Sequence, residues 1–278
     1  AVDSSVLADD TRIINDMNRI FGNSVVYYEF GNEEDLLGVD VTRYTASWNA
    51  IVPQLKRIAL HGQFVGPVNF QYDRAYLTSF LQNANPRPDQ VSWHEYTCDD
   101  SWANDICISH IDHWTNHISD ARAAMTATIG TTLPIMITEW NYAPNAVPND
   151  GKNNNSSFMT TWTTKALQTL AANRIFASMQ YSCTNTAIPL IDGSGILTSQ
   201  GMVFQGLYQQ MIIAKQQPAS LSTPTAGGTV QATPTTNGNG TPNPTTTAVS
   251  NSNATFSFED GGTDGWSGHG SQIANVQN

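Results

Sequence analysis

Residues 24–34 read SVVYYEFGNEE, a run of apolar and aromatic residues that ends in glycine, asparagine and two acids. The valines and tyrosines favour a β-strand, whereas glycine and asparagine disfavour one. We therefore expect the strand to end near Gly31. Either the polar residues that follow begin an ordinary loop, or the strand carries them to a functional site.

Similar short apolar runs recur along the chain and alternate with segments of helical periodicity. The runs are QFVGPV (63–68), QVSWHEY (90–96), LPIMITEW (133–140) and IFASMQY (175–181). Helical faces precede, separate and follow them, as in the spacing of Trp48, Ile51 and Leu55. Continuous apolar strands that alternate with helices predict an α/β fold with a parallel sheet whose faces are covered.

Two architectures fit five strands of this kind. An open doubly wound sheet would be complete with five strands, and the local pattern slightly favours it for that reason. The alternative is the later part of a (β/α)8 barrel, which needs three further βα units. Local periodicity does not separate the two, so the chemistry at the strand ends has to decide.

The bulk composition excludes several classes of ligand. The 278 residues carry a net charge of −11, and their 12 lysines and arginines form no cluster, so nucleic acid is not an expected partner. No run of 18 apolar residues occurs, which predicts no membrane span. We expect a monomer that needs no metal ion and no cofactor.

The composition changes abruptly at Gln216, which predicts where the main domain (residues 1–215) ends. Residues 216–254 are almost wholly Thr, Pro, Ser, Asn, Gly and Ala, which bury too little apolar surface to offset chain entropy and predict a linker. Residues 255–278 resume apolar alternation around Phe256, Phe258 and Trp266. A piece of about 25 residues cannot fold alone, so we expect the start of another domain.

The cysteines and a group of histidines leave two questions open. Cys98 and Cys107 bracket a short loop, and a disulfide between them and a pair of reduced thiols have about equal support. His110, His113 and His117 lie at i, i+3 and i+7, roughly along one helix face. We interpret these histidines as a polar helix surface rather than as a metal site.

Polar side chains concentrate where three of the strands are expected to end. Glu33 follows the first strand, Glu139 lies at the end of the fourth, and His94 and Tyr96 share one side of the third. In parallel α/β folds, ligands bind beyond the carboxyl ends of the strands. Two carboxylates that face each other across a sugar suit cleavage of a glycosidic bond, because one protonates the leaving oxygen while the other attacks the anomeric carbon or activates water.

The same residues carry a resemblance to a known group of enzymes. YEFGNE (28–33) resembles the strand-four motif of the retaining glycoside hydrolases of clan A, and IMITEW (135–140) resembles their strand-seven motif. TASWNAIVPQLKRI, FVGPVNF and DQVSWHEYT are similar to the intervening segments, nearest to family 39-like and family 5-like enzymes. The resemblance covers about residues 10–215 and implies a partial (β/α)8 TIM barrel made of strands four to eight.

This resemblance implies a role for each matching position. Glu33 would be the general acid/base, and Glu139 the nucleophile that forms a glycosyl-enzyme intermediate. Asn32 would bind the sugar 2-hydroxyl, while Tyr96 or His94 would orient Glu139.

Trp140 has two open roles, and the end of the fifth strand departs from the family pattern. We expect Trp140 either to form a sugar platform or to pack in the core. Family members often have a tryptophan at the end of strand eight, whereas this chain reads SMQY at 178–181. Tyr181 or Gln180 is the expected substitute, and the sugar preference stays open.

The resemblance further implies a piece of a longer secreted enzyme. Strands one to three have no match in this chain, and FEDGGTDGW (258–266) resembles the first strands of a β-sandwich carbohydrate-binding module. We therefore expect a catalytic barrel, a linker and a sugar-binding module, with the piece inactive by itself. The rival hypotheses are a non-catalytic carbohydrate-binding protein on the same scaffold and an unrelated five-stranded α/β protein.

Overall fold

The computed structural model describes residues 4–99, 101–143 and 150–216, which alternate between strands and helices. The strands are β1 (Val26–Glu29), β2 (Gly62–Asn69), β3 (Gln90–Tyr96), β4 (Ile135–Asn141) and β5 (Ala177–Gln180). The helices are α1 (Ser4–Phe21), α2 (Val41–Leu55), α3 (Arg74–Asn83), α4 (Asn104–Ser109), α5 (Asp112–Ile129), α6 (Ser156–Ala172) and α7 (Ser199–Gln216).

The strands form where the apolar runs predict them. β3 is buried at every position, and β2 is buried from Phe64 to Asn69, as continuous apolar runs require. The short helix α4 was not predicted, because six residues are too few to show a helical period. The other helices lie on the periodic segments.

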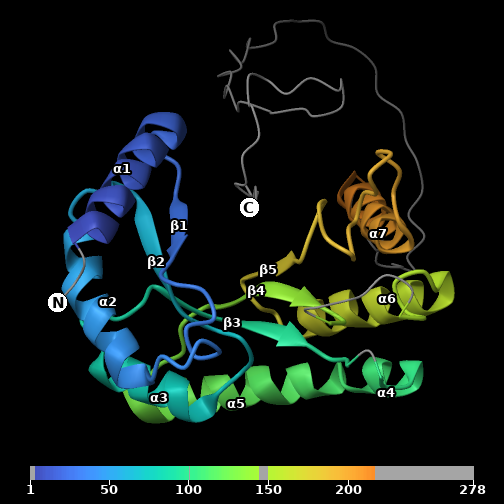
Figure 1. Cartoon of the computed structure of the whole chain (residues 1–278), viewed down its shortest axis with the longest axis horizontal. Helices are drawn as coiled ribbons and strands as arrows, with labels where there is room; N and C mark the ends of the chain where they lie inside the picture. The colour runs from blue at the N-terminus through green and yellow to red at the C-terminus, as the bar shows by residue number, and fades with distance from the viewer. Residues whose placement is uncertain (1–3, 100, 144–149, 217–278) are drawn as a thin grey trace, which may run out of the picture. The chain divides into compact units, whose positions relative to one another are not determined.

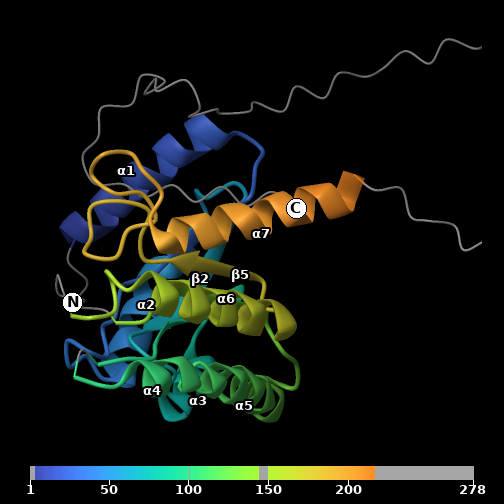
Figure 2. The ribbon, with the colours of Figure 1, turned by 90° about the vertical axis from the view of Figure 1, so that its right-hand side faces the viewer.

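The five strands form one parallel sheet whose order in space follows the order in the chain. β1 pairs with β2, β2 with β3, β3 with β4 and β4 with β5, all in parallel. A doubly wound sheet reverses its strand order at a switch point, and this sheet does not. The sheet instead curls into a half-barrel with its helices outside, which confirms the partial barrel that the resemblance implied (Figures 1 and 2). The slight preference of the local pattern for an open doubly wound sheet is corrected.

The helices pack on the outer surface of the sheet through two groups of aromatic side chains. Near β1 and β2, the rings of Phe30, Tyr44, Trp48 and Phe80 contact one another, mostly edge to face. Near β4, the contacts join Trp114, Trp140, Trp162 and Phe204. All three of these tryptophans are at most 1% exposed, so this second group is the core between the sheet and α5 to α7.

One glycine is required by the first aromatic group. A Cβ atom on Gly66 would lie 2.8 Å from the Tyr44 hydroxyl and 3.1 Å from the Trp48 ring. Glycine at this point of β2 lets α2 approach the strand closely.

Side chains cap the N-termini of α2 and α6. The Asp40 side chain accepts hydrogen bonds from the backbone of Thr42 and Arg43 at the start of α2. The Asn155 side chain does the same for Phe158 in α6. These bonds satisfy backbone donors that have no partner inside the helix.

Three further expectations concern the cysteines, membrane spans and the C-terminal segments of the chain. Cys98 and Cys107 form a disulfide, with their Cα atoms 4.7 Å apart, which settles the question that the sequence left open. No helix among the described residues has both the length and the apolar character to cross a membrane. The predicted module (255–278) and all but the first residue of the predicted linker (216–254) lie outside the described residues, and α7 reaches Gln216.

We expect Trp162→Ala to lower the free energy of unfolding by about 3–5 kcal/mol, because it empties a closed part of the core. Trp162 has no exposed surface, and its Nε1–H donates to the Thr97 hydroxyl at 2.8 Å. Urea denaturation followed by circular dichroism measures the change. The matched control is Tyr208→Ala at a position that is 65% exposed, where a change within about 0.5 kcal/mol is expected. Equal effects of the two substitutions would contradict this account of the core.

Candidate active site

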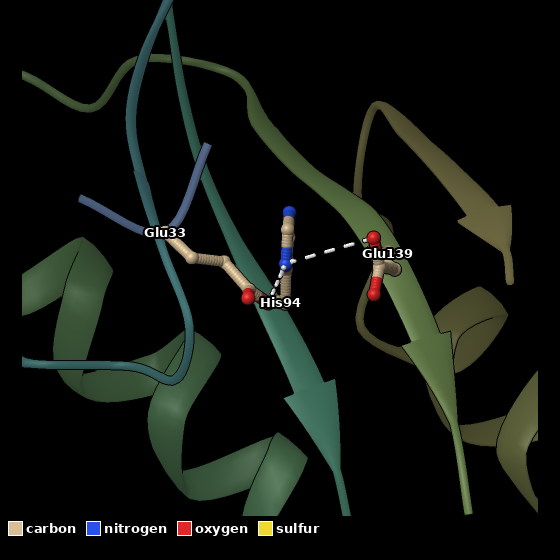
Figure 3. Close-up of side chains that lie close together, drawn as sticks. All are labelled: Glu33, His94 and Glu139. Carbon is tan, nitrogen blue, oxygen red and sulfur yellow. Dashed lines mark hydrogen bonds and ion pairs between the residues drawn. The ribbon is translucent and has the colours of Figure 1, made fainter. Parts of the chain in front are cut away.

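Three side chains from separate elements meet at the carboxyl ends of the strands. Glu33 follows β1, His94 lies in β3 and Glu139 lies in β4 (Figure 3). The His94 ring lies between the two carboxyl groups, with its Nδ1 2.7 Å from Glu33 Oε1 and 4.0 Å from Glu139 Oε2. His94 is 1% exposed, whereas Glu33 and Glu139 are 18% and 21% exposed. The carboxylates are therefore accessible to a ligand, and the imidazole is held beneath them.

Irregular pairing of the strands aims these side chains. The register between β3 and β4 shifts after Trp93, so that His94 pairs with Glu139. A second shift separates Ile137 from Trp140 in the pairing of β4 with β5. Such irregularities re-aim side chains and are frequent beside active sites.

The backbone that presents Glu33 adopts a conformation that is uncommon for residues other than glycine. Glu33 has a φ of 52°, and Gly31, two residues before it, has a φ of 86°. The Glu33 N–H donates to the carbonyl of Val68 at 2.9 Å, and Val68 itself has a φ of 59°. A β-branched residue in this region is strained, and such strain often occurs at functional sites. This hydrogen bond from Glu33 to Val68 thus fixes the turn that contains Glu33 to the end of β2.

A second link fixes the same turn to β2. The Asp35 carboxylate accepts a hydrogen bond from the backbone N–H of Phe70 at 3.0 Å. The Phe70 ring in turn stacks on Tyr96, with the ring centres 6.0 Å apart. The loops after β1 and β2 are therefore connected to the residues that surround Glu139.

Tyr96 holds the second carboxylate. Its hydroxyl donates a hydrogen bond to Glu139 Oε1. Burial, the hydrogen bond to Glu139 and the negative charge of Glu139 all raise the pKa of Tyr96 well above its ordinary value. The phenol therefore remains a donor throughout the usual pH range, and a donor to an ionised carboxylate stabilises its charged form.

A third carboxylate lies on the same face of the sheet. Glu29 is the last residue of β1, and it lies close enough to His94 and Glu139 for their charges to change its pKa. Glu29 retains exposed surface, but the surrounding protein removes its carboxyl from bulk water, which raises its pKa. The nearby Thr138 and Ser92 hydroxyls and the charge of His94 lower the pKa, and the charge of Glu139 raises it again. The net effect is a pKa above the ordinary value, so this surface disfavours a further negative charge.

The structure brings four of the predicted site residues together. Glu33, His94, Tyr96 and Glu139 are brought together, with Tyr96 bound to Glu139 and His94 bound to Glu33. Asn32 is exposed beside Glu33.

Trp140 and Tyr181 differ in how much of their surface is exposed. Trp140 has no exposed surface and packs against Trp114, Trp162 and Phe204, so the sugar-platform prediction is corrected in favour of the core alternative. Tyr181 is half-buried directly after β5, and it is close enough to Tyr96 to contribute to the raised pKa of that residue, which places it near the site.

Sequence reasoning missed part of the polar network at the end of β4. Asn141 Nδ2 donates to the Tyr181 carbonyl at 2.6 Å, and Gln200 bonds to both Asn141 and Gln180. Gln200 lies in α7, far from the other residues in sequence. Only its burial, at 1% exposed, marks this glutamine as unusual, and burial is not visible in a single sequence.

The donor atoms of the site also suit a cation. Ligand atoms of Glu33, His94 and Glu139 lie within 4.8 Å of one another, and among the described residues this is the group of histidine, cysteine and acidic side chains that meets that limit. Two carboxylates and an imidazole are ordinary ligands of divalent metals. The same negative charge favours a ligand that develops positive charge.

Comparison with known proteins gives a fold but no family. No family model matches the chain, and no curated protein matches it. A monomeric β-xylosidase from Caulobacter crescentus CB15 is similar in structure, with a TM-score of 0.56 and 15% identity over 73% of this chain and 46% of that chain. The α-L-arabinofuranosidase from Thermotoga maritima gives a TM-score of 0.54 and 16% identity over 72% and 46%.

A third solved structure extends this similarity. The GH51 arabinofuranosidase from Xanthomonas axonopodis pv. citri gives a TM-score of 0.53 and 16% identity over 71% of this chain and 48% of that chain. This chain therefore spans about half the length of the structures that it resembles. At these identities the similarity shows the fold alone, a partial TIM barrel of the kind found in these glycosidases.

We expect Glu29→Gln to change how stability depends on pH. Because the folded-state pKa of Glu29 is raised, the folded protein binds the proton more tightly than the unfolded chain does. The native protein should therefore lose stability as the pH rises from the ordinary carboxyl pKa through the raised pKa of Glu29. Glu29→Gln removes this loss, so its stability relative to the native protein should increase over that interval. Thermal unfolding at several pH values tests the sign, and a difference that is constant with pH would contradict it.

Proposed function

We propose that this chain is part of a glycoside hydrolase that cleaves O-glycosidic bonds of an oligosaccharide or polysaccharide with retention of configuration. The main support is the approach of the Glu33 and Glu139 carboxylate oxygens to within 4.8 Å of each other. Retaining enzymes hold their two carboxyl groups about 5–5.5 Å apart, whereas inverting enzymes leave about 6.5–9.5 Å for a water molecule. The short separation therefore favours direct attack by a carboxylate.

The hydrogen bonds divide the two roles between the carboxyl groups. Glu139 Oε1 accepts from the Tyr96 hydroxyl, a donor that stabilises negative charge on a carboxylate, and Oε2, 4.0 Å from His94 Nδ1, is the oxygen that would attack the anomeric carbon. Glu33 Oε1 contacts His94, which leaves its Oε2 to deliver a proton to the glycosidic oxygen. We therefore assign Glu139 as the nucleophile and Glu33 as the general acid/base.

The proposed reaction then takes two balanced steps. Glu139 bonds to the anomeric carbon as the glycosidic bond breaks, and Glu33 transfers its proton to the departing oxygen. A water molecule next attacks the anomeric carbon and gives a proton to Glu33 as the bond to Glu139 breaks. Both carboxyl groups return to their first states, and no metal is needed for this step.

Location and context support the same proposal. A disulfide such as Cys98–Cys107 persists in oxidising compartments, which fits a secreted protein. Because the chain spans about half the length of its structural neighbours, we propose the activity for a complete barrel. Activity is to be measured on the longest natural form of the protein that contains these residues. Asn32, which is exposed, and Tyr181 are the proposed contacts to the sugar.

We expect Glu139→Gly to reduce hydrolysis to near background and azide to restore turnover. The panel of activated aryl glycosides should include β-xylosides and α-L-arabinofuranosides, the sugars named for the structural neighbours. Azide would fill the space of the missing carboxylate and attack the anomeric carbon once, so the glycosyl azide should have inverted configuration. Nuclear magnetic resonance of the product identifies the anomer. Full activity of this variant without azide would refute the nucleophile assignment.

Glu33→Ala should give the opposite stereochemical result. Loss of a general acid/base is expected to slow turnover about 10²–10⁴-fold, with less effect on substrates whose leaving group needs no proton. Glu139 can still form the glycosyl-enzyme, which azide then attacks, so the glycosyl azide should have retained configuration. Carbohydrate binding by all variants without hydrolysis by the native protein would instead favour the non-catalytic carbohydrate-binding alternative.

A further inference from the structure

Two overlapping acceptor motifs for N-linked glycans lie at the start of α6. Residues 154–157 read NNSS, so Asn154 has Ser156 two positions after it, and Asn155 has Ser157. An asparagine two residues before a serine, with no proline between them, is the acceptor motif for N-glycosylation. The sequence does not rank the two motifs, because both end in serine. The proposed glycosidase reaction uses neither asparagine.

Asn155 is part of the hydrogen bonding that begins α6. Its side-chain oxygen accepts from the backbone N–H of Phe158 at 3.0 Å, and its backbone carbonyl accepts from the N–H of Met159 at 2.9 Å. Its own backbone N–H donates to the carbonyl of Lys152 at 2.9 Å. Asn155 is half-buried, and the Phe158 residue that it caps is only 4% exposed. A glycan on Asn155 would therefore crowd the first turn of the helix and disturb its cap.

Asn154 lies in an exposed turn whose backbone is held in place. The Asp150 carboxylate accepts from the backbone N–H groups of Lys152 and Asn153 at 2.8 Å and 2.9 Å. It also accepts from the hydroxyl of the buried Tyr142 at 2.7 Å, which connects the turn to the residue after β4. Asn154 itself is exposed. N-linked glycans are bulky and lie in solvent, so the structure offers Asn154 rather than its neighbour as the acceptor.

A disulfide indicates the kind of compartment in which such motifs are modified. Cys98 and Cys107 are bonded to each other, and disulfides form and persist in secreted proteins and in the lumen of the endoplasmic reticulum. N-linked glycans are attached to secreted proteins in that lumen. This support does not depend on the proposed glycosidase activity.

We propose that Asn154 is a site of N-linked glycosylation and that Asn155, in the overlapping motif, is not. The donor is an oligosaccharide joined through a diphosphate to a lipid. A bond forms between Asn154 Nδ2 and the C1 atom of the sugar as the bond from C1 to the diphosphate oxygen breaks. The lipid diphosphate leaves with the electron pair of that bond, and the amide gives one proton to a base of the transferring enzyme. The glycan would lie between β4 and α6, at the end of the sheet that carries Glu139.

Mass spectrometry of the full chain, secreted from a eukaryotic host that attaches N-linked glycans, tests the proposal. Trypsin cleaves after Lys152 and Lys165, so residues 153–165 form one peptide that holds both motifs and no other. Peptide-N-glycosidase in heavy-oxygen water converts a glycosylated asparagine to a labelled aspartate, and fragmentation of the peptide locates the label. We expect the label at Asn154. A label at Asn155, or at neither asparagine, in the secreted protein would overturn the proposal.

Two serine variants are matched controls for each other. Ser156→Ala removes the motif of Asn154 and leaves that of Asn155, because alanine is accepted at the middle position, and we expect it to lose the label from this peptide. Ser157→Ala removes only the motif of Asn155 and should keep the native occupancy of Asn154. Both serines are exposed at the start of α6, so we expect both variants to fold, as checked by circular dichroism. Native occupancy at Asn155 in folded Ser156→Ala would show that the helix start does not exclude a glycan and would contradict the proposal.

Discussion

The pairing of β3 with β4 is the constraint on which the candidate active site depends. A parallel ladder places the carboxyl ends of neighbouring strands side by side, and its shift after Trp93 sets His94 opposite Glu139. The pairing also brings Tyr96, two residues further along β3, to within hydrogen-bonding distance of Glu139. Side chains 43 residues apart thus act as one group because backbone hydrogen bonds hold their strands in register.

The two surfaces of the curved sheet have different chemistry. Glu139 points toward His94 and solvent, whereas the next residue, Trp140, packs among the aromatic rings of the helices. Successive residues of a strand alternate between faces, so a single segment supplies both the site and its support. The closely packed outer surface fixes the strands and therefore limits the movement of the carboxylates.

The electrostatics of the site are those of an acidic surface with few positive partners. In the described part of the chain, the bonds to Glu33 and Glu139 come from His94 and Tyr96, not from lysine or arginine. Glu29 adds a carboxyl whose ionisation is opposed by its surroundings. A group with this arrangement stabilises positive charge as it develops on a ligand, as in an oxocarbenium-like transition state. The same property explains why these ligand atoms also suit a divalent cation.

The sequence by itself determined the positions of the strands, most of the helices and the residues that end three of the strands. Local patterns carry this information, because burial of a strand or of a helix face requires apolar residues at fixed spacing. Local periodicity could not choose between a doubly wound sheet and a barrel, and it was the resemblance of the strand-end motifs that implied the barrel. The sequence also left open whether Trp140 is a sugar platform or part of the core, and whether Cys98 and Cys107 form a disulfide. Those outcomes, together with the pairing of Tyr96 with Glu139 and of His117 with Glu95, were decided by tertiary structure. The physical reason is that strand order, burial and side-chain contacts depend on residues distant in the chain, whose approach no local spacing encodes.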